Sequence, residues 1–239
     1  MTRPMRDALA ALDSRFDVAE HTVQLAGHTV VLEKPRNRDK LISEEDYARD
    51  ERLPYWADLW PAATALANVI AAPPPGLEWP HAAGARPRTL ELGCGLGLVT
   101  VAAIRAGLDV TATDYYEDAL HFTARNALTN TGVEPTLRMV DWRVLPDDLG
   151  TYDVVLAADV LYERPHAALV AATVLRTLAP GGRMLLADQG RTALKAFLKK
   201  TAAGGLTHRT VHVAPTPAPA DAPENSCLAP IGIYELRHA

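Results

Sequence analysis

The stretch TLELGCGLGLVTVAA, residues 89–103, sets the pattern for most of this chain. A short apolar run ends at Leu92, three glycines follow at alternate positions, and a second apolar run begins at Leu98. Glycine can adopt a positive φ, and a ligand can approach its backbone closely because it has no Cβ. The stretch therefore predicts a strand, a glycine-rich turn and a helix, with a ligand bound at the carboxyl end of the strand.

After this stretch, short apolar runs alternate with helical stretches. Strands are expected at 89–93, 109–114, 136–141, 152–160 and 183–188, and helices between them end near 105, 130, 178 and 203. This alternation is typical of a parallel sheet with crossover helices on both faces. The last two strand-like runs, 207–213 and 231–237, have no helix between them, so they must pair antiparallel or lie apart. We expect an α/β fold of the Rossmann type, mostly parallel, with an antiparallel C-terminal strand.

The first part of the chain has a different pattern. Residues 5–20 predict a short helix, and 21–35 predict a hairpin that turns at Ala26-Gly27. Residues 36–54 are highly charged and predict a solvated connection or an exposed helix. Residues 55–72 predict a helix with Pro61 in its first turn, where proline is tolerated. We expect an N-terminal helix and hairpin extension over 1–52 and one larger domain over 53–239.

Composition narrows the possible partners and compartments. The chain has 239 residues, 48% of them hydrophobic and 22% charged, with a formal net charge of −5. Such a charge gives no general attraction to nucleic acid or to anionic lipid, and no apolar run approaches the length of a membrane span. Cys94 and Cys227 provide neither a disulfide framework nor a metal-ligand cluster. These features predict a cytoplasmic protein without nucleic-acid or membrane partners and without a bound metal.

The spacing of the glycines discriminates between nucleotide ligands. Dinucleotide-binding turns carry G-x-G-x-x-G, whereas this chain has G-x-G-x-G with Leu98 at the third glycine position of that motif, and it has no G-x-x-x-x-G-K-[ST] stretch. LELGCGLG instead resembles the first motif of the class I, seven-strand methyltransferases that use S-adenosylmethionine (SAM). The resemblance covers about residues 53–239. It implies SAM as cofactor, with contacts at Glu91, Gly93, Cys94, Gly95 and Gly97.

Carboxylates at the ends of the next strands extend the predicted cofactor site. Asp114 ends the second strand of the body, where a carboxylate can accept both hydroxyl groups of a ribose. Its alternative role is that of a helix cap, because Asp is a favoured N-cap residue. Asp141 and Trp142 resemble the family's adenine contact, a carboxylate beside an aromatic wall, although a lone Trp is often only packing. The resemblance also places Tyr115 at the cofactor.

LAADVLYE, residues 156–163, points to one branch of these methyltransferases. Its Asp-x-x-Tyr pattern resembles that of the family-16 type protein methyltransferases. These include the electron-transfer flavoprotein β-subunit lysine methyltransferases and the chaperone-modifying lysine methyltransferases. The segments LPYWADLWP and LLADQGR resemble the same branch. The resemblance implies that Asp159 orients a lysine amine, that Tyr162 shapes the slot, and that Trp60 and Ala158 contact the cofactor.

Alternative roles remain open for these residues. Trp56 and Trp60 can belong to a hydrophobic lid helix without a ligand, and Asp159 and Tyr162 can be a helix-capping Asp and a core Tyr. The predicted function is SAM-dependent methyl transfer to a lysine of a protein substrate. The alternatives are methyl transfer to a small-molecule amine and a SAM-binding module without activity. The oligomeric state and the identity of the acceptor are left open.

Overall fold

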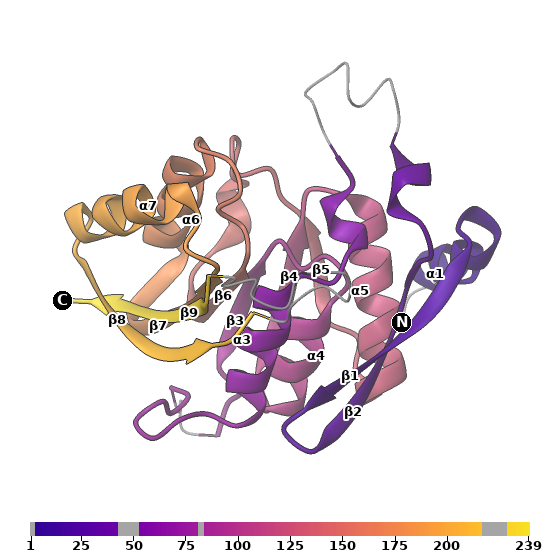
Figure 1. Ribbon diagram of the computed structural model, residues 1–239, viewed down its shortest axis with the longest axis horizontal. Coiled ribbons are helices and arrows are strands. Elements are labelled where there is room, and N and C mark those ends of the chain that lie inside the picture. Colours follow the sequence, from indigo (N-terminus) through magenta and orange to yellow (C-terminus); the bar gives the residue numbers. More distant parts are fainter. Residues whose placement is uncertain (1–2, 43–52, 81–83, 217–228) are drawn as a thin grey trace.

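The computed structural model describes residues 3–42, 53–80, 84–216 and 229–239 and contains a seven-stranded sheet with the strand order β5-β4-β3-β6-β7-β9-β8 (Figure 1). Its strands are β3 (Arg88–Leu92), β4 (Asp109–Asp114), β5 (Thr136–Met139), β6 (Tyr152–Ala158), β7 (Leu178–Asp188), β8 (Leu206–Ala214) and β9 (Ile231–His238). The first five of these strands, β3 to β7, run parallel to one another. The prediction of a mostly parallel Rossmann-like sheet is confirmed.

β9 is the strand that runs against the others. It lies between β7 and β8 and pairs antiparallel with both. The two C-terminal runs therefore pair antiparallel with each other, which is one of the two arrangements that the missing crossover helix allowed. Parts of the segment that joins them lie outside the described residues, and so does Cys227.

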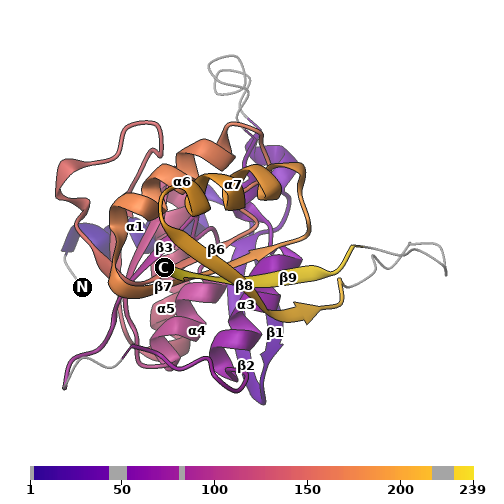
Figure 2. The same ribbon diagram turned by 90° about the vertical axis from the view of Figure 1, so that its left-hand side faces the viewer.

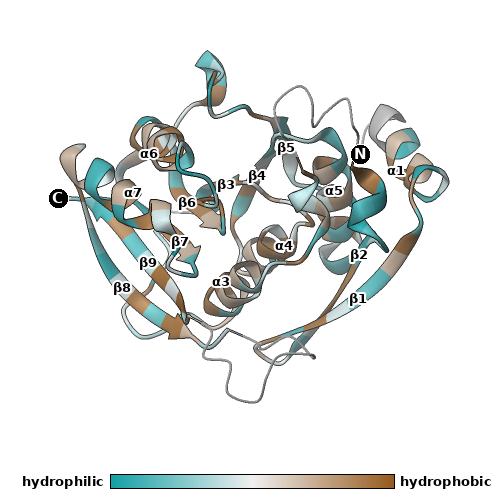
Figure 3. Ribbon diagram, turned by 45° about the horizontal axis from the view of Figure 1, so that its top comes forward, coloured by the Kyte–Doolittle hydropathy of each residue, from teal (hydrophilic) through white to brown (hydrophobic). Residues whose placement is uncertain are grey.

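Helices cover both faces of the sheet, as Figure 2 shows. One face carries α3 (Pro61–Ala71), α4 (Leu98–Arg105) and α5 (Glu117–Thr131), and the other carries α6 (His166–Thr177) and α7 (Thr192–Ala203). In strand β6, successive side chains point to opposite faces of the sheet. Val154 and Leu156 belong to the core under α3 and α4, whereas Val155 and Ala157 belong to the core under α6 and α7. In Figure 3, α3 and α4 are coloured mostly in brown shades, which marks their apolar composition.

Three boundaries differ most from the sequence prediction. The N-terminal helix α1 is Arg3–Arg15 and ends earlier than expected, because β1 begins at Val18 and pairs with β2. β7 begins at Leu178, before Gly181 and Gly182, and its pairing with β6 shifts register there. The helix expected within 55–72 begins at Pro61, and a short 3-10 turn, η2 (Tyr55–Ala57), precedes it. Of the charged connection expected at 36–54, η1 (Arg38–Leu41) is described, and 43–52 lie outside the described residues.

The predicted hairpin consists of β1 (Val18–Leu25) and β2 (His28–Pro35), and it turns at Ala26-Gly27, both with positive φ. Two asparagines on α5 hold its edge. Asn126 accepts the N–H of Glu33 at 2.8 Å and donates to the carbonyl of the same residue at 2.9 Å. Asn130 does the same with Val31, at 3.0 and 2.8 Å. Side-chain amides thus occupy the place of a neighbouring strand, and the hairpin packs its apolar residues into the core of the larger domain.

No helix in the described ranges is long and apolar enough to cross a membrane.

Candidate active-site cleft

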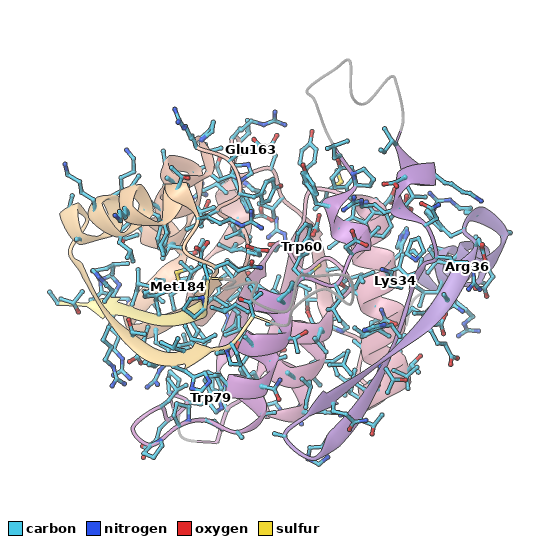
Figure 4. The ribbon with its side chains drawn as sticks, viewed as in Figure 1. Lys34, Arg36, Trp60, Trp79, Glu163 and Met184 are labelled. Carbon is cyan, nitrogen blue, oxygen red and sulfur yellow. The ribbon has the colours of Figure 1, made fainter. Side chains whose placement is uncertain are left out.

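A cleft of about 370 Å³ opens at the carboxyl edge of the sheet. Its walls come from the loops that follow β3, β4, β5 and β6 and from residues 53–63 in front of α3. Pockets of this size hold drug-sized ligands. Figure 4 shows the position of Trp60 near the centre of the molecule, with Glu163 above it and Lys34 to its right. Each predicted site residue except Gly97 lines this cleft.

The glycine loop after β3 forms one end of the cleft. Its three glycines all have positive φ, from 54° at Gly95 to 81° at Gly97. A Cβ on Gly95 would lie 3.3 Å from the carbonyl oxygen of Trp56. Gly97 does not line the cleft, and a Cβ there would lie 2.9 Å from the Cα of Thr123. The need for glycine at 97 therefore comes from the close approach of α5 and from the positive φ.

Two carboxylates are buried beside this loop. Thr100 donates its hydroxyl to Glu91, and burial raises the pKa of Glu91 to about 8. Asp114 accepts the N–H of Gly95 at 3.0 Å and that of Tyr116 at 3.1 Å, and burial raises its pKa as well. The N-cap of α5 is Tyr116, so Asp114 does not cap that helix. Instead, Asp114 ties the glycine loop to the end of β4.

Cys94 lies between these carboxylates and is buried. Burial and the neighbouring carboxylates raise the pKa of its thiol. A thiol in this environment stays protonated, so it is not a nucleophile.

Further along the cleft, Asp141 and Trp142 follow β5. Arg143 binds both oxygens of Asp141, at 2.9 Å from Nε and 2.8 Å from Nη2. The same guanidinium donates to the hydroxyl of Tyr115 at 3.1 Å. The sequence prediction included Asp141 and Tyr115 but not Arg143, which joins them. The ring of Trp142 packs edge-on against His166, with centroids 5.4 Å apart.

Asp159, directly after β6, belongs to a second region of the cleft lining. It has a φ of 59°, which is unusual for a residue with a side chain, and its N–H donates to the carbonyl of Ala187 on β7. Arg191 binds its carboxylate with both arms, Nε to Oδ1 at 2.5 Å and Nη2 to Oδ2 at 2.8 Å. Gln189 adds a contact to Oδ2 at 3.4 Å. The Asp159 side chain is only 2% exposed.

Aromatic rings surround this region. The ring of Tyr162 lies 5.2 Å from that of Tyr55 and 4.5 Å from that of His166. Trp60 packs against Tyr55 and donates its indole N–H to the carbonyl of that residue. Burial lowers the pKa of His166, so this imidazole is neutral near pH 7. Tyr162 is 43% exposed, so it is a wall of the cleft and not a core residue.

Several residues of this region were missed by the sequence prediction. Arg191 is the main one, and the signal for it was weak: it is the last residue of LLADQGR, three positions after Asp188. Its N–H donates to Asp188 at 2.8 Å, which fixes the start of α7 and aims the guanidinium at Asp159. Other residues that line the cleft and were not predicted are Tyr55, Asp58, Arg143, Glu163 and His166.

Solved structures share this architecture. Magnesium protoporphyrin IX methyltransferase from Synechocystis, solved with bound SAM, matches 84% of this chain and 95% of its own at a TM-score of 0.56 and 19% identity. Ribosomal protein L11 methylase from Lactobacillus delbrueckii matches 74% of this chain and 79% of its own at a TM-score of 0.52 and 18% identity. The fold is that of the class I SAM-dependent methyltransferases.

Sequence similarity defines the family further. Residues 43–203, more than half of the chain, match the family described as lysine methyltransferase, and the chain belongs to this family. SAM is its cofactor. A ubiquinone biosynthesis O-methyltransferase of Methylococcus capsulatus is 33% identical over 119 residues, 49% of each chain. EEF1A lysine methyltransferase 3 of Mus musculus is 34% identical over 110 residues, 44% of this chain and 46% of its own. The chain spans about half the length of these curated relatives.

Proposed function

We propose that this chain transfers the methyl group of SAM to the side-chain amine of a lysine in another protein. The observation that carries the proposal is that the carboxylate of Asp159 and the packed rings of Tyr55, Trp60 and Tyr162 line the same cleft, in the region proposed for the acceptor. A carboxylate can orient an amine through a hydrogen bond, and aromatic rings attract cationic side chains. Membership of the lysine methyltransferase family and the lysine activity in the name of the mouse relative support the same acceptor.

The other end of the cleft fits SAM in shape and charge. The backbone of Gly93 and Gly95 forms a floor without side chains, because a Cβ at either position would lie 3.2–3.3 Å from its neighbours. SAM carries a ribose diol, an ammonium and a sulfonium, and the buried carboxylates of Glu91 and Asp114 suit the positive groups and the diol. In this proposal Asp114 binds the ribose, Glu91 attracts the ammonium, and Trp142 and Tyr115 flank the adenine.

The transfer itself needs mainly alignment. The amine nitrogen donates its lone pair to the methyl carbon of SAM, and the bond to sulfur breaks with its electron pair left on the sulfur. Orientation of reactants can contribute about 7–11 kcal/mol to such a step. Asp159 and the ring of Tyr162 hold the amine in line, and the rings of Tyr55 and Trp60 keep water away.

The acceptor must also lose its proton before it reacts. A lysine amine with a pKa near 10.4 costs about 4.6 kcal/mol to deprotonate at pH 7, at about 1.36 kcal/mol per pH unit. Desolvation in the slot and the positive sulfonium lower that cost.

A small-molecule acceptor is the second candidate. The relatives named ubiquinone biosynthesis O-methyltransferase carry a name that indicates a small acceptor. A small amine would also fit the same cleft. The two candidates differ in where the methyl group ends up.

The test is incubation of the purified protein with tritiated SAM and a cell lysate, with the protein and small-molecule fractions counted separately. We expect label in protein, and acid hydrolysis should release it as methyllysine. Asp114→Ala should remove labelling together with SAM affinity measured by calorimetry. Label only in the small-molecule fraction would replace the lysine proposal by the second candidate, and no label in either would contradict both.

A further inference from the structure

The carboxylate of Asp159 creates a chemical problem for a lysine acceptor, and its ion pair with Arg191 solves that problem. A carboxylate alone stabilises the ammonium form of a nearby amine and so raises the pKa of that amine. Only the uncharged amine can attack the methyl group. An unpaired carboxylate at this end of the cleft would therefore hold the acceptor in its unreactive form.

Arg191 changes this balance without blocking the carboxylate completely. A carboxylate has about four lone-pair positions. Arg191 uses one on each oxygen, and Gln189 uses a second on Oδ2. One position on Oδ1 is left, enough for a single N–H of an amine. An amine bound there would lie within about 5.5 Å of the Arg191 Nε, given the 2.5 Å ion-pair contact and a hydrogen bond of about 2.9 Å.

We infer that Arg191 is a positioning residue that neutralises Asp159 and thereby keeps the acceptor amine in its uncharged, nucleophilic form. This inference rests on the proposed function, because it requires an amine acceptor. It assigns two separate tasks to the pair: the carboxylate aims the amine, and the guanidinium cancels the charge that would hold a proton on it.

The surroundings leave this task to Arg191. The guanidinium keeps its charge, because its hydrogen bonds to Asp159 raise its pKa. Its Cζ lies 5.9 Å from the centre of the ring of Trp60, which lines the cleft, and its side chain is 30% exposed. Within the described part of the chain, no contact places another cation on Asp159. The ionisable groups that interact with the pair are an acid and a phenol, Asp188 beside it and Tyr55 in front of α3. Tyr162 and Glu163 follow Tyr55 along the cleft, and Tyr234 on β9 lies behind Asp188.

The experiment measures kcat and KM between pH 6 and pH 10 with tritiated SAM and the protein that the lysate assay labels. The variants are Arg191→Gln, which removes the charge, and Arg191→Lys, which keeps a charge but loses the two-armed geometry. For Arg191→Gln we expect the rising limb of the kcat profile to move up by about 1–2 pH units, the range for a nearby charge. At pH 7 this is a loss of about tenfold or more in kcat, and the loss should shrink towards pH 10.

Two readouts separate this role from a merely structural one. In Arg191→Gln, KM for the acceptor should stay the same or fall, because the bare carboxylate binds the ammonium form well. In Arg191→Lys the rising limb of the kcat profile should stay within about 0.5 pH unit of the wild type, because a positive charge remains at a similar distance from Asp159. Lys195→Gln on the exposed side of α7 is the control for net charge and should leave the profile in place.

Each outcome decides the point. Equal loss of kcat at every pH in Arg191→Gln, with SAM affinity intact, would reduce Arg191 to a structural partner and overturn the inference. Lysine methylation by the wild type with an unmoved limb in the variant would overturn the inference but leave the proposed function. Absence of lysine methylation by the wild type at all pH values would overturn the proposed function and the inference with it.

Discussion

The two ends of the cleft treat buried negative charge in opposite ways. Beside the glycine loop, the contacts of Glu91 and Asp114 are with uncharged donors, a hydroxyl and backbone N–H groups. Burial raises the pKa of both carboxyls. Asp159 is as deeply buried, but a guanidinium holds both of its oxygens. The carboxyls beside the glycine loop can therefore ionise to pair with an arriving cation, whereas the charge of Asp159 is already balanced by Arg191.

This difference corresponds to the charges that the proposed reaction brings to each end. SAM brings positive groups to the glycine loop, where a carboxylate that would otherwise keep its proton can pair with them. A lysine amine must lose its charge at Asp159 before it reacts. The lesson is that a buried carboxylate in a cleft is informative only together with its nearest cation.

The largest effect expected from this contrast concerns Glu91 in the absence of added SAM. Its pKa is about 8 in the folded chain and near 4.5 when unfolded, so the folded state holds a proton that the unfolded state loses between these values. Stability therefore falls as pH rises from 4.5 to 8, by up to about 5 kcal/mol. Glu91→Gln should reduce that slope and leave the part due to Asp114, whose pKa burial also raises, measured as the free energy of unfolding in urea at several pH values. A wild-type curve that is flat over this range would show that Glu91 is ionised throughout.

A smaller effect is expected at the other end from Asp159→Ala. Transfer to the acceptor should fall by about 100-fold or more in kcat/KM, about 2.7 kcal/mol, because the amine loses its orienting group. Stability should fall by about 2 kcal/mol, less than the 3–5 kcal/mol of a fully buried pair, because the Arg191 side chain is 30% exposed. SAM affinity, measured by calorimetry, should stay within about twofold of the wild type. Loss of SAM binding in this variant would place Asp159 at the cofactor end and remove the contrast.

The five parallel strands were predictable because each is an apolar run that ends at, or within two residues of, a glycine or an acidic residue. The boundaries that were missed depend on pairing between distant segments. β7 begins at Leu178 because that residue pairs with Tyr152. No local sequence pattern predicts this pairing. The attachment of the hairpin depends on Asn126 and Asn130, which in sequence are ordinary polar positions of a crossover helix.

The candidate site shows the same division. Residues directly after a strand were predicted, because parallel strands bring their carboxyl ends to one edge of the sheet. Residues that act through a partner were not. Arg191 is 32 positions from Asp159, and Arg143 bridges Asp141 and Tyr115, which follow different strands. Gly97 carries the glycine pattern but packs against Thr123 outside the cleft, since spacing alone cannot separate a ligand contact from a close helix approach.

The smallest effect is expected from Tyr162→Phe, and it sharpens the comparison within the acceptor end. The contacts of Tyr162 are made by its ring, which lies 5.2 Å from Tyr55 and 4.5 Å from His166. Phenylalanine keeps these contacts, so kcat/KM for the acceptor should fall by no more than about threefold, under about 0.7 kcal/mol. Tyr162→Ala removes the wall itself and should lose more than Tyr162→Phe while SAM affinity stays unchanged. A loss in Tyr162→Phe as large as that in Asp159→Ala would assign the chemistry to the hydroxyl, and the carboxylate would then be its support.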